Sequence, residues 1–174
     1  MGIVVIGAVF VDIKGYPLST YIPGGRKQVH GGVSRNVAED IANVELRPTF
    51  VSLVDDTGSG QDVIDKLDKH KVNTRFIRRV HDGMGTWLAV FDNDGDVTAA
   101  ISKRPDTRPL TALLAENEEG IFADCDSVAL ELDLEKETVK QVLRSAKKYG
   151  KRVYAVISNM SIAMERRDFL QQID

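Results

Sequence analysis

The sequence predicts an α/β fold with a parallel sheet, from two patterns that alternate along the chain. Short apolar runs rich in β-branched residues recur, as expected of buried strands. They cover residues 3–6, 50–54, 75–77, 127–132 and 153–157. Apolar residues at helical spacing lie between several of these runs, at Val33, Val37 and Ile41, at Val63, Ile64 and Leu67, and at Val139, Val142, Leu143 and Ala146. Such alternation favours a parallel sheet flanked by helices.

Two segments interrupt the alternation and are expected to form hairpins. The first covers residues 12–29 and contains the turn-forming residues Pro17, Pro23 and Gly24. In the second, about residues 85–101, two β-rich runs flank the turn sequence Asp92-Asn93-Asp94-Gly95. Together the hairpins could form a small β lid over the carboxyl ends of the sheet strands, where open α/β sheets bind ligands.

Length and composition indicate one domain and exclude several classes of partner. The 174 residues are 43% hydrophobic, which suffices for one core. The 23 basic and 26 acidic residues are interspersed and give a net charge of -3, so no basic stripe could bind nucleic acid. Cys125 is the sole cysteine and cannot form an internal disulfide. We expect it to act as a small apolar residue near the start of a buried strand.

Several familiar site motifs are absent from the sequence. The start of the chain has no signal-peptide pattern, and no apolar run is long enough to span a bilayer, so a cytoplasmic protein is expected. The first strand is not followed by a dinucleotide fingerprint, and the chain has no P-loop. His30, His70 and His81 lack metal-ligand spacing, so no metal site is predicted. For His30, a spacing role is favoured over catalysis.

The most specific segment is a glycine pair, Gly31-Gly32, that opens a predicted helix. Glycines let a ligand approach the backbone closely, and the free N–H groups of the first helical turn can donate to ligand oxygens. Asn36, one turn further, can both donate and accept hydrogen bonds. Asp12, placed at the end of the first strand, could accept hydrogen bonds from two neighbouring hydroxyl groups. An ordinary glycine-rich helix entry is the alternative.

The sequence resembles the ribokinase-like (PfkB-type) carbohydrate and nucleoside kinases over essentially its whole length. Gly31-Gly32 with Asn36 and Ala38 matches that family's substrate motif, and Asp12 matches its sugar-hydroxyl acceptor. Both expected hairpins fall where the family builds its lid. Residues 31–39 with the run from Thr86 to Val90 look most similar to the pseudouridine-kinase branch, although Ser102-Lys103-Arg104-Pro105 departs from that branch.

A third part of the expected substrate site is Asp133. Glu131-Leu132-Asp133 ends a predicted strand where the family places polar substrate contacts, and Asp133 is the better match. Solvated charges at the start of a loop are the alternative there. Lys103 and Arg104 could contact an anionic substrate, but basic side chains at a strand end are usually solvated. The segment from Asp55 to Gly60 departs from the family pattern and is interpreted as a strand-to-helix turn.

The resemblance implies an ATP-dependent kinase that phosphorylates a primary hydroxyl of a sugar or of a nucleoside such as pseudouridine. In the family, a C-terminal glycine-rich turn and its aspartate act together with ATP and Mg²⁺, and this chain contains no such motif. The chain ends at Asp174, directly after a segment with helical spacing at 166–173. We therefore expect residues 1–174 to be the N-terminal portion of one ribokinase-like domain, with no catalytic residue and no bound cofactor of its own.

Two further expectations concern partners. A chain that stops within an α/β repeat would leave a sheet edge unpaired, so a homo-oligomer formed through the lid or that edge is expected. The alternative to an enzyme is a non-catalytic ligand-binding or dimerisation module. Neither a nucleic acid nor a membrane is expected as a partner.

Overall fold

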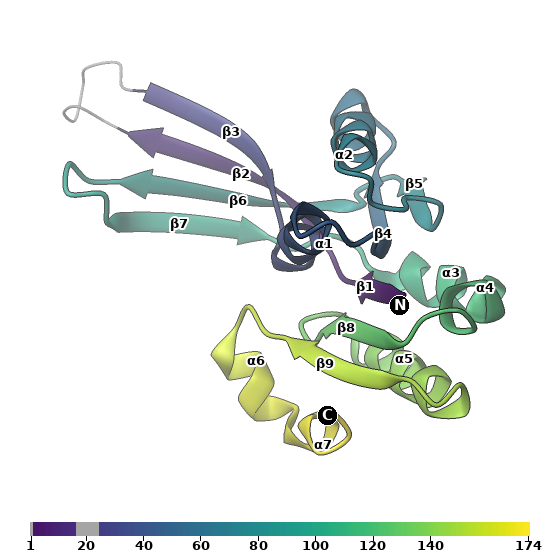
Figure 1. Cartoon of the computed structure of the whole chain (residues 1–174). Coiled ribbons are helices and arrows are strands. Elements are labelled where there is room, and N and C mark those ends of the chain that lie inside the picture. The colour runs from purple at the N-terminus through teal and green to yellow at the C-terminus, as the bar shows by residue number, and fades with distance from the viewer. Residues whose placement is uncertain (1, 17–24) are drawn as a thin grey trace.

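The computed structural model describes residues 2–16 and 25–174 and contains two sheets (Figure 1). The larger sheet has five parallel strands in the order β5-β4-β1-β8-β9. Its strands are β1 (Ile3–Ile6), β4 (Thr49–Asp55), β5 (Ile77–Val80), β8 (Ser127–Glu131) and β9 (Arg152–Val156). This arrangement confirms the predicted α/β class.

Helices cover both faces of this sheet. They are α1 (Val33–Asn43), α2 (Gly58–Lys69), α3 (Arg108–Glu116), α4 (Glu118–Phe122), α5 (Lys136–Lys148), α6 (Met160–Glu165) and α7 (Arg167–Leu170). Because side chains alternate along a strand, the central strand β1 serves two cores. Val4 and Ile6 pack with residues of α3, α4 and α5, whereas Val5 packs with residues of α1 and α2. Both cores therefore depend on one four-residue strand.

The smaller sheet is a four-stranded lid that extends to one side of the helices (Figure 1). Its order is β3-β2-β6-β7, formed by β2 (Val9–Tyr16), β3 (Gly25–Gly31), β6 (Met84–Phe91) and β7 (Val97–Lys103). Each hairpin is antiparallel, and the two are joined through parallel pairing of β2 with β6. Both predicted hairpins are confirmed. The predicted turn residues Pro17, Pro23 and Gly24 lie outside the described residues.

The structure corrects the position of Asp12. It was expected at the end of the first strand, but β1 ends at Ile6 and Asp12 lies in the middle of β2. The chain leaves the large sheet at Gly7 and Ala8, and Val9 begins the pairing with Met84 of the lid. The apolar residues on both sides of Gly7 give no sign of this break, because strands of either sheet have the same composition.

Other boundaries differ where the local pattern was weak. The strand expected at 75–77 is β5, Ile77–Val80, since Thr74 to Phe76 form the turn that leads into it. The helix expected at 166–173 is shorter, α7 at Arg167–Leu170, and the short helix α6 that precedes it at Met160–Glu165 was not predicted. Helices α3 and α4 were not predicted, although Leu110, Leu113 and Leu114 of α3 are buried at helical spacing.

No helix within the described residues is both long and apolar enough to cross a membrane.

Candidate functional site

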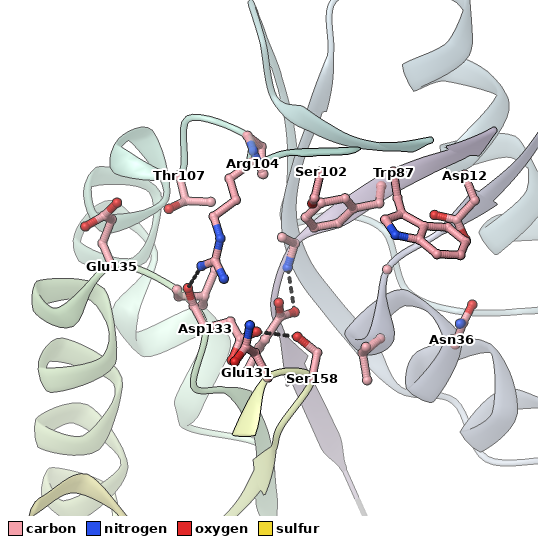
Figure 2. Close-up of a pocket in the computed structure, with 17 residues that line it drawn as sticks. Asp12, Asn36, Trp87, Ser102, Arg104, Thr107, Glu131, Asp133, Glu135 and Ser158 are labelled. Carbon is pink, nitrogen blue, oxygen red and sulfur yellow. Dashed lines mark hydrogen bonds between the residues drawn. The ribbon is translucent and has the colours of Figure 1, made fainter. Parts of the chain in front are cut away.

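A cavity of about 510 Å³ lies between the lid and the loops that follow β8 and β9 (Figure 2). Its volume is in the range typical of small-molecule sites. The lining residues are Ala8, Phe10, Asp12, Gly32, Val33, Asn36, Trp87, Ser102, Arg104, Pro105, Thr107, Glu131, Asp133, Leu134, Glu135, Ser158 and Asn159. The cavity thus lies beyond the carboxyl ends of parallel strands, where ligands of open α/β sheets bind.

Strand register places the lid residues of the cavity on one face. Asp12 of β2 is the partner of Trp87 in β6, and Trp87 is the partner of Ser102 in β7. Directly paired residues point to the same face of a sheet, as do residues two apart in one strand, such as Phe10 and Asp12. Gly85, opposite Phe10, leaves room for its ring, because a Cβ on Gly85 would lie 2.4 Å from a ring carbon. A carboxylate and two aromatic rings therefore share this face.

The glycine pair brings three backbone segments into close contact. Gly31 ends β3, and a Cβ there would lie 2.3 Å from a carboxylate oxygen of Asp12. Gly32 precedes α1 with φ of 98°. A Cβ on Gly32 would lie 2.6 Å from the carbonyl oxygen of Ala8. Glycine is required at position 32 because the chain turns into α1 against the β1–β2 connection, whereas Gly31 leaves room for the Asp12 carboxylate.

Asp12 is partly shielded from water on the cavity face of the lid. Burial raises the pKa of its carboxyl group, and the positive charges of Lys14 and Arg35 oppose that rise. Asn36 lies in the first turn of α1, is exposed to the cavity, and is labelled with Asp12 in Figure 2. The structure therefore brings together Asp12, Gly32 and Asn36, as the sequence analysis expected. Gly31 does not line the cavity itself but packs against the Asp12 carboxylate.

Asp133, the fifth expected residue, lies across the cavity from these groups. One carboxylate oxygen accepts a hydrogen bond from Ser158, and the other, Oδ1, is buried without a hydrogen-bond partner among the described residues. Arg104, at the end of the lid, donates to the backbone carbonyl of Asp133 at 3.3 Å. Arg166 is buried and donates to the carbonyls of Leu132 and Leu134 on either side. The loop that carries Asp133 is thereby held by two guanidinium groups.

Glu131 is a buried cavity residue that the sequence analysis treated as the weaker match. It is only 4% exposed, and its Oε2 accepts hydrogen bonds from the Ala8 amide at 3.0 Å and the Ser34 hydroxyl at 2.7 Å. A Cβ on Gly7 would lie 2.4 Å from that oxygen. Burial raises the pKa of Glu131 against these two hydrogen bonds, and the nearby Asp133 charge raises it further. Glu131 therefore joins β8, α1 and the β1–β2 connection below the cavity.

We predict that the free energy of unfolding of Glu131→Gln falls less than that of wild type as the pH rises. Because the pKa of Glu131 is higher in the folded state, the folded protein binds more protons than the unfolded chain above the ordinary pKa of 4.5. The wild-type free energy of unfolding should therefore fall as pH rises from that value, and the glutamine variant should lack this contribution. Urea unfolding between pH 4.5 and 8 measures the difference. Exposed Glu165→Gln is the control, and an identical pH slope for wild type and Glu131→Gln would contradict the prediction.

His30 lies outside the cavity lining and contacts Ser59 of α2, with 3.3 Å between Nε2 and Oγ. Burial lowers the pKa of the ring, partly offset by the charge of Asp62. This position favours the spacing role expected for His30 over catalysis. Cys125 is buried just before β8, as predicted.

The described residues do not by themselves suit a metal ion. Within 2–16 and 25–174, no group of three or more His, Cys, Asp or Glu side chains could hold one. Magnesium requires several oxygen ligands in near-octahedral geometry, and the separate carboxylates of the cavity do not supply them. No step of the chemistry is therefore assigned to a metal held by these residues alone.

Two known kinases are similar to this chain in sequence. Guanosine-inosine kinase of Exiguobacterium acetylicum is 33% identical over 178 residues, which cover 97% of this chain and 58% of that protein. Pseudouridine kinase of Escherichia coli is 26% identical over 137 residues, which cover 71% of this chain and 44% of that protein. The chain therefore spans about half the length of these relatives.

Solved structures share the fold at lower sequence identity. Ribokinase of Giardia lamblia superimposes with a TM-score of 0.82 at 16% identity, covering 99% of this chain and 56% of that one. Arabidopsis thaliana ribokinase, solved with ribose and ATP, gives a TM-score of 0.79 at 21% identity and covers 99% and 58%. The family model for pfkB family carbohydrate kinases matches residues 2–174. This chain belongs to the PfkB family of carbohydrate kinases.

Proposed function

We propose that the protein phosphorylates the primary hydroxyl group of a nucleoside, and that this chain supplies the substrate-binding half of the site. The observation that carries the proposal is the pairing, in one cavity, of hydrogen-bond acceptors with an aromatic wall. Asp12 and Asp133 offer carboxylate oxygens, and Phe10 and Trp87 offer ring faces. Binding a sugar alone requires only the carboxylate oxygens, whereas binding a nucleoside also uses the ring faces.

The polar groups suit a ribose ring. The unpartnered Oδ1 of Asp133 is buried, and such an oxygen is costly unless a ligand donates to it. Asp12 can accept from neighbouring hydroxyls on the other side of the cavity, with Asn36 beside it. The first turn of α1, opened by Gly31-Gly32, adds free backbone N–H groups. The proposed substrate site thus contains Asp12, Gly32, Asn36 and Asp133 in its lining, and Gly31 behind the Asp12 carboxylate.

The charge of the cavity favours a neutral substrate. Asp12, Glu131 and Asp133 would repel a phosphate group. The two basic residues that end the lid are already engaged, since Lys103 pairs with Asp82 and Arg104 donates to a backbone carbonyl. A free nucleoside therefore fits better than a nucleotide or a sugar phosphate.

The aromatic wall and the relatives together favour a nucleoside base. Trp87 and Phe10 can stack on a planar ring. The chain is similar to a guanosine-inosine kinase at 33% identity and to a pseudouridine kinase at 26%. We therefore place a 6-oxopurine nucleoside first among candidate substrates and pseudouridine second.

The phosphoryl donor is proposed to be ATP with Mg²⁺, bound mainly by residues beyond this chain. Phosphoryl transfer depends on positioning and on stabilising charge, so a site that only orients the accepting hydroxyl is half of the machinery. The magnesium ion would neutralise phosphate charge when bound. The described residues contribute the orientation of the nucleoside and the exclusion of water by the lid.

The test is a kinase assay on the protein produced from its complete gene, with ATP and Mg²⁺. Guanosine, inosine, pseudouridine, ribose and fructose are compared, and we expect 5′-phosphorylation of a nucleoside with the highest kcat/KM. Residues 1–174 alone should transfer no phosphate. Efficient use of a free sugar with no nucleoside turnover would refute the substrate proposal. Nucleoside binding by the complete protein without turnover would instead favour the non-catalytic binding module.

We also propose that two copies associate through the lid. Strand β7 is an exposed edge, and Leu88 and Ile101 are register partners on the face opposite Trp87. Ile101 is 71% exposed and Leu88 39% exposed, which makes this face apolar. Light scattering over a dilution series should give a dimer or larger species, and Ile101→Lys should shift it toward monomer. A monomer at tens of micromolar would refute this association.

A further inference from the structure

A buried arginine lies directly behind the residues proposed to bind substrate. Arg35 is 5% exposed, and its guanidinium group contacts three partners. Nε donates to the carbonyl of Gly31 at 3.2 Å, and the two terminal nitrogens donate to Oδ1 of Asn36 and to the carboxylate of Glu39. One side chain therefore joins the glycine turn to the Asn36 amide.

The contact with Asn36 fixes which end of the amide can reach a ligand. Arginine has donors and no acceptor, so the carbonyl oxygen of Asn36 must face it. The Asn36 NH₂ group has no hydrogen-bond partner among the described residues, and Asn36 lines the cavity. In this orientation Asn36 offers hydrogen-bond donors to the cavity.

Arg35 is itself held in place by Glu39, which has basic neighbours of its own. Glu39, which accepts from Arg35, is also paired with Lys66 at 3.2 Å and lies 3.6 Å from Nε2 of His70, both from the α2 region. Burial raises the pKa of Glu39, but hydrogen bonds from Arg35 and Lys66 outweigh it and give a net lowering. The guanidinium charge also opposes the raised pKa of Asp12. The arginine is thus anchored by Glu39, and its charge also acts on Asp12.

We propose that Arg35 is a positioning residue that sets the hydrogen-bond polarity of the substrate site, holding Asn36 as a donor beside Asp12 as an acceptor. This inference rests on the proposed function. A donor beside an acceptor matches two neighbouring hydroxyl groups, one accepting from Asn36 and the other donating to Asp12. An intact ribose 2′,3′-diol presents such a pair, and a deoxyribose does not. Arg35 would therefore contribute to selectivity for ribonucleosides without contacting them.

The experiment is a double-mutant cycle on the protein from its complete gene, using guanosine and 2′-deoxyguanosine as probes. Arg35→Lys keeps the charge but replaces the planar fork by a single ammonium group, which cannot hold all three partners. We expect guanosine KM and Kd to rise about tenfold, kcat to change less than about twofold, and the preference over 2′-deoxyguanosine to shrink. In the Asn36→Ala background, Arg35→Lys should have little further effect. Lys66→Gln is the matched control, because it removes another partner of Glu39 without touching Asn36, and its guanosine Kd should equal that of wild type.

Equal losses from Arg35→Lys in the wild-type and Asn36→Ala backgrounds would overturn the proposal, because they would indicate general destabilisation. An unchanged Kd in Arg35→Lys would also overturn it. If wild type binds no nucleoside, the proposed function fails, and the side-chain amide NMR signal of Asn36 decides on Arg35 separately. That signal should shift in ligand-free Arg35→Lys and stay in place in Lys66→Gln; no shift in Arg35→Lys would show that the contact is absent.

Discussion

Replacing Asp12 with alanine is expected to reduce nucleoside kcat/KM by roughly tenfold to a hundredfold. A hydrogen bond to a charged group contributes roughly 1.5–3 kcal/mol, and each 1.4 kcal/mol corresponds to about a factor of ten. Asp12 lies on the cavity face of the lid beside Trp87, and its position is set by pairing with both β3 and β6. The backbone should therefore persist when the carboxylate is removed.

The measurement is steady-state kinetics of the complete protein, combined with calorimetric binding of guanosine. Asp12→Asn separates charge from shape, because the amide keeps the size but can accept through one oxygen only. Lys14→Ala is the matched control, since Lys14 lies on the same face two residues further along β2 but does not line the cavity. Asp12→Ala kinetics equal to those of wild type would remove Asp12 from the proposed site.

The second large effect concerns stability at Gly32. Alanine at Gly32 should lower the free energy of unfolding by about 2–5 kcal/mol, the sum of a strained φ and an overpacked contact. The native φ is 98°, and the added Cβ would lie 2.6 Å from the Ala8 carbonyl oxygen, which is backbone and cannot rotate away. Guanosine binding should weaken as well, because the turn that opens α1 would move.

Gly95 provides a control because its φ is also positive, but a Cβ there would make no close contact. Its φ is 90°, and a Cβ there would meet nothing within 4 Å. Gly95→Ala should therefore cost only the conformational part, about 1–2 kcal/mol. Chemical denaturation of both variants gives the comparison. Equal losses at the two positions would show that close approach to Ala8 adds nothing.

The sequence predicted the parts of the fold that have strong local patterns. The apolar runs at 50–54 and 127–132 correspond to β4 and β8, and the Asp92 to Gly95 turn joins β6 to β7. The parallel pairing of β2 with β6 could not be read from the chain, because it joins segments about 75 residues apart and neither carries a register signal.

Parts of the candidate site could be predicted from the sequence where a residue type has few structural roles at its position other than a role in a site. A glycine pair before a helix and an isolated polar residue among apolar ones, such as Asp12, led to residues that line or border the cavity. The family resemblance favoured Asp133 over Glu131, and a strand-end position alone gives no sign that Glu131 is buried. The role inferred for Arg35 depends on the geometry of three contacts within residues 31–39, and it was not expected because a basic residue in a helix is usually solvated.

The carboxylate of Glu131 also bears on when the cavity forms during folding. Its two hydrogen bonds join residues separated by 123 and 97 positions in the chain, to Ala8 and Ser34 respectively. Contacts this distant in sequence form only after much of the chain is ordered, because closing long loops costs entropy first. During synthesis, the lid strands and α1 leave the ribosome well before β8. The floor of the cavity is consequently completed late, and until then Ala8 and Ser34 lack the partner that fixes them.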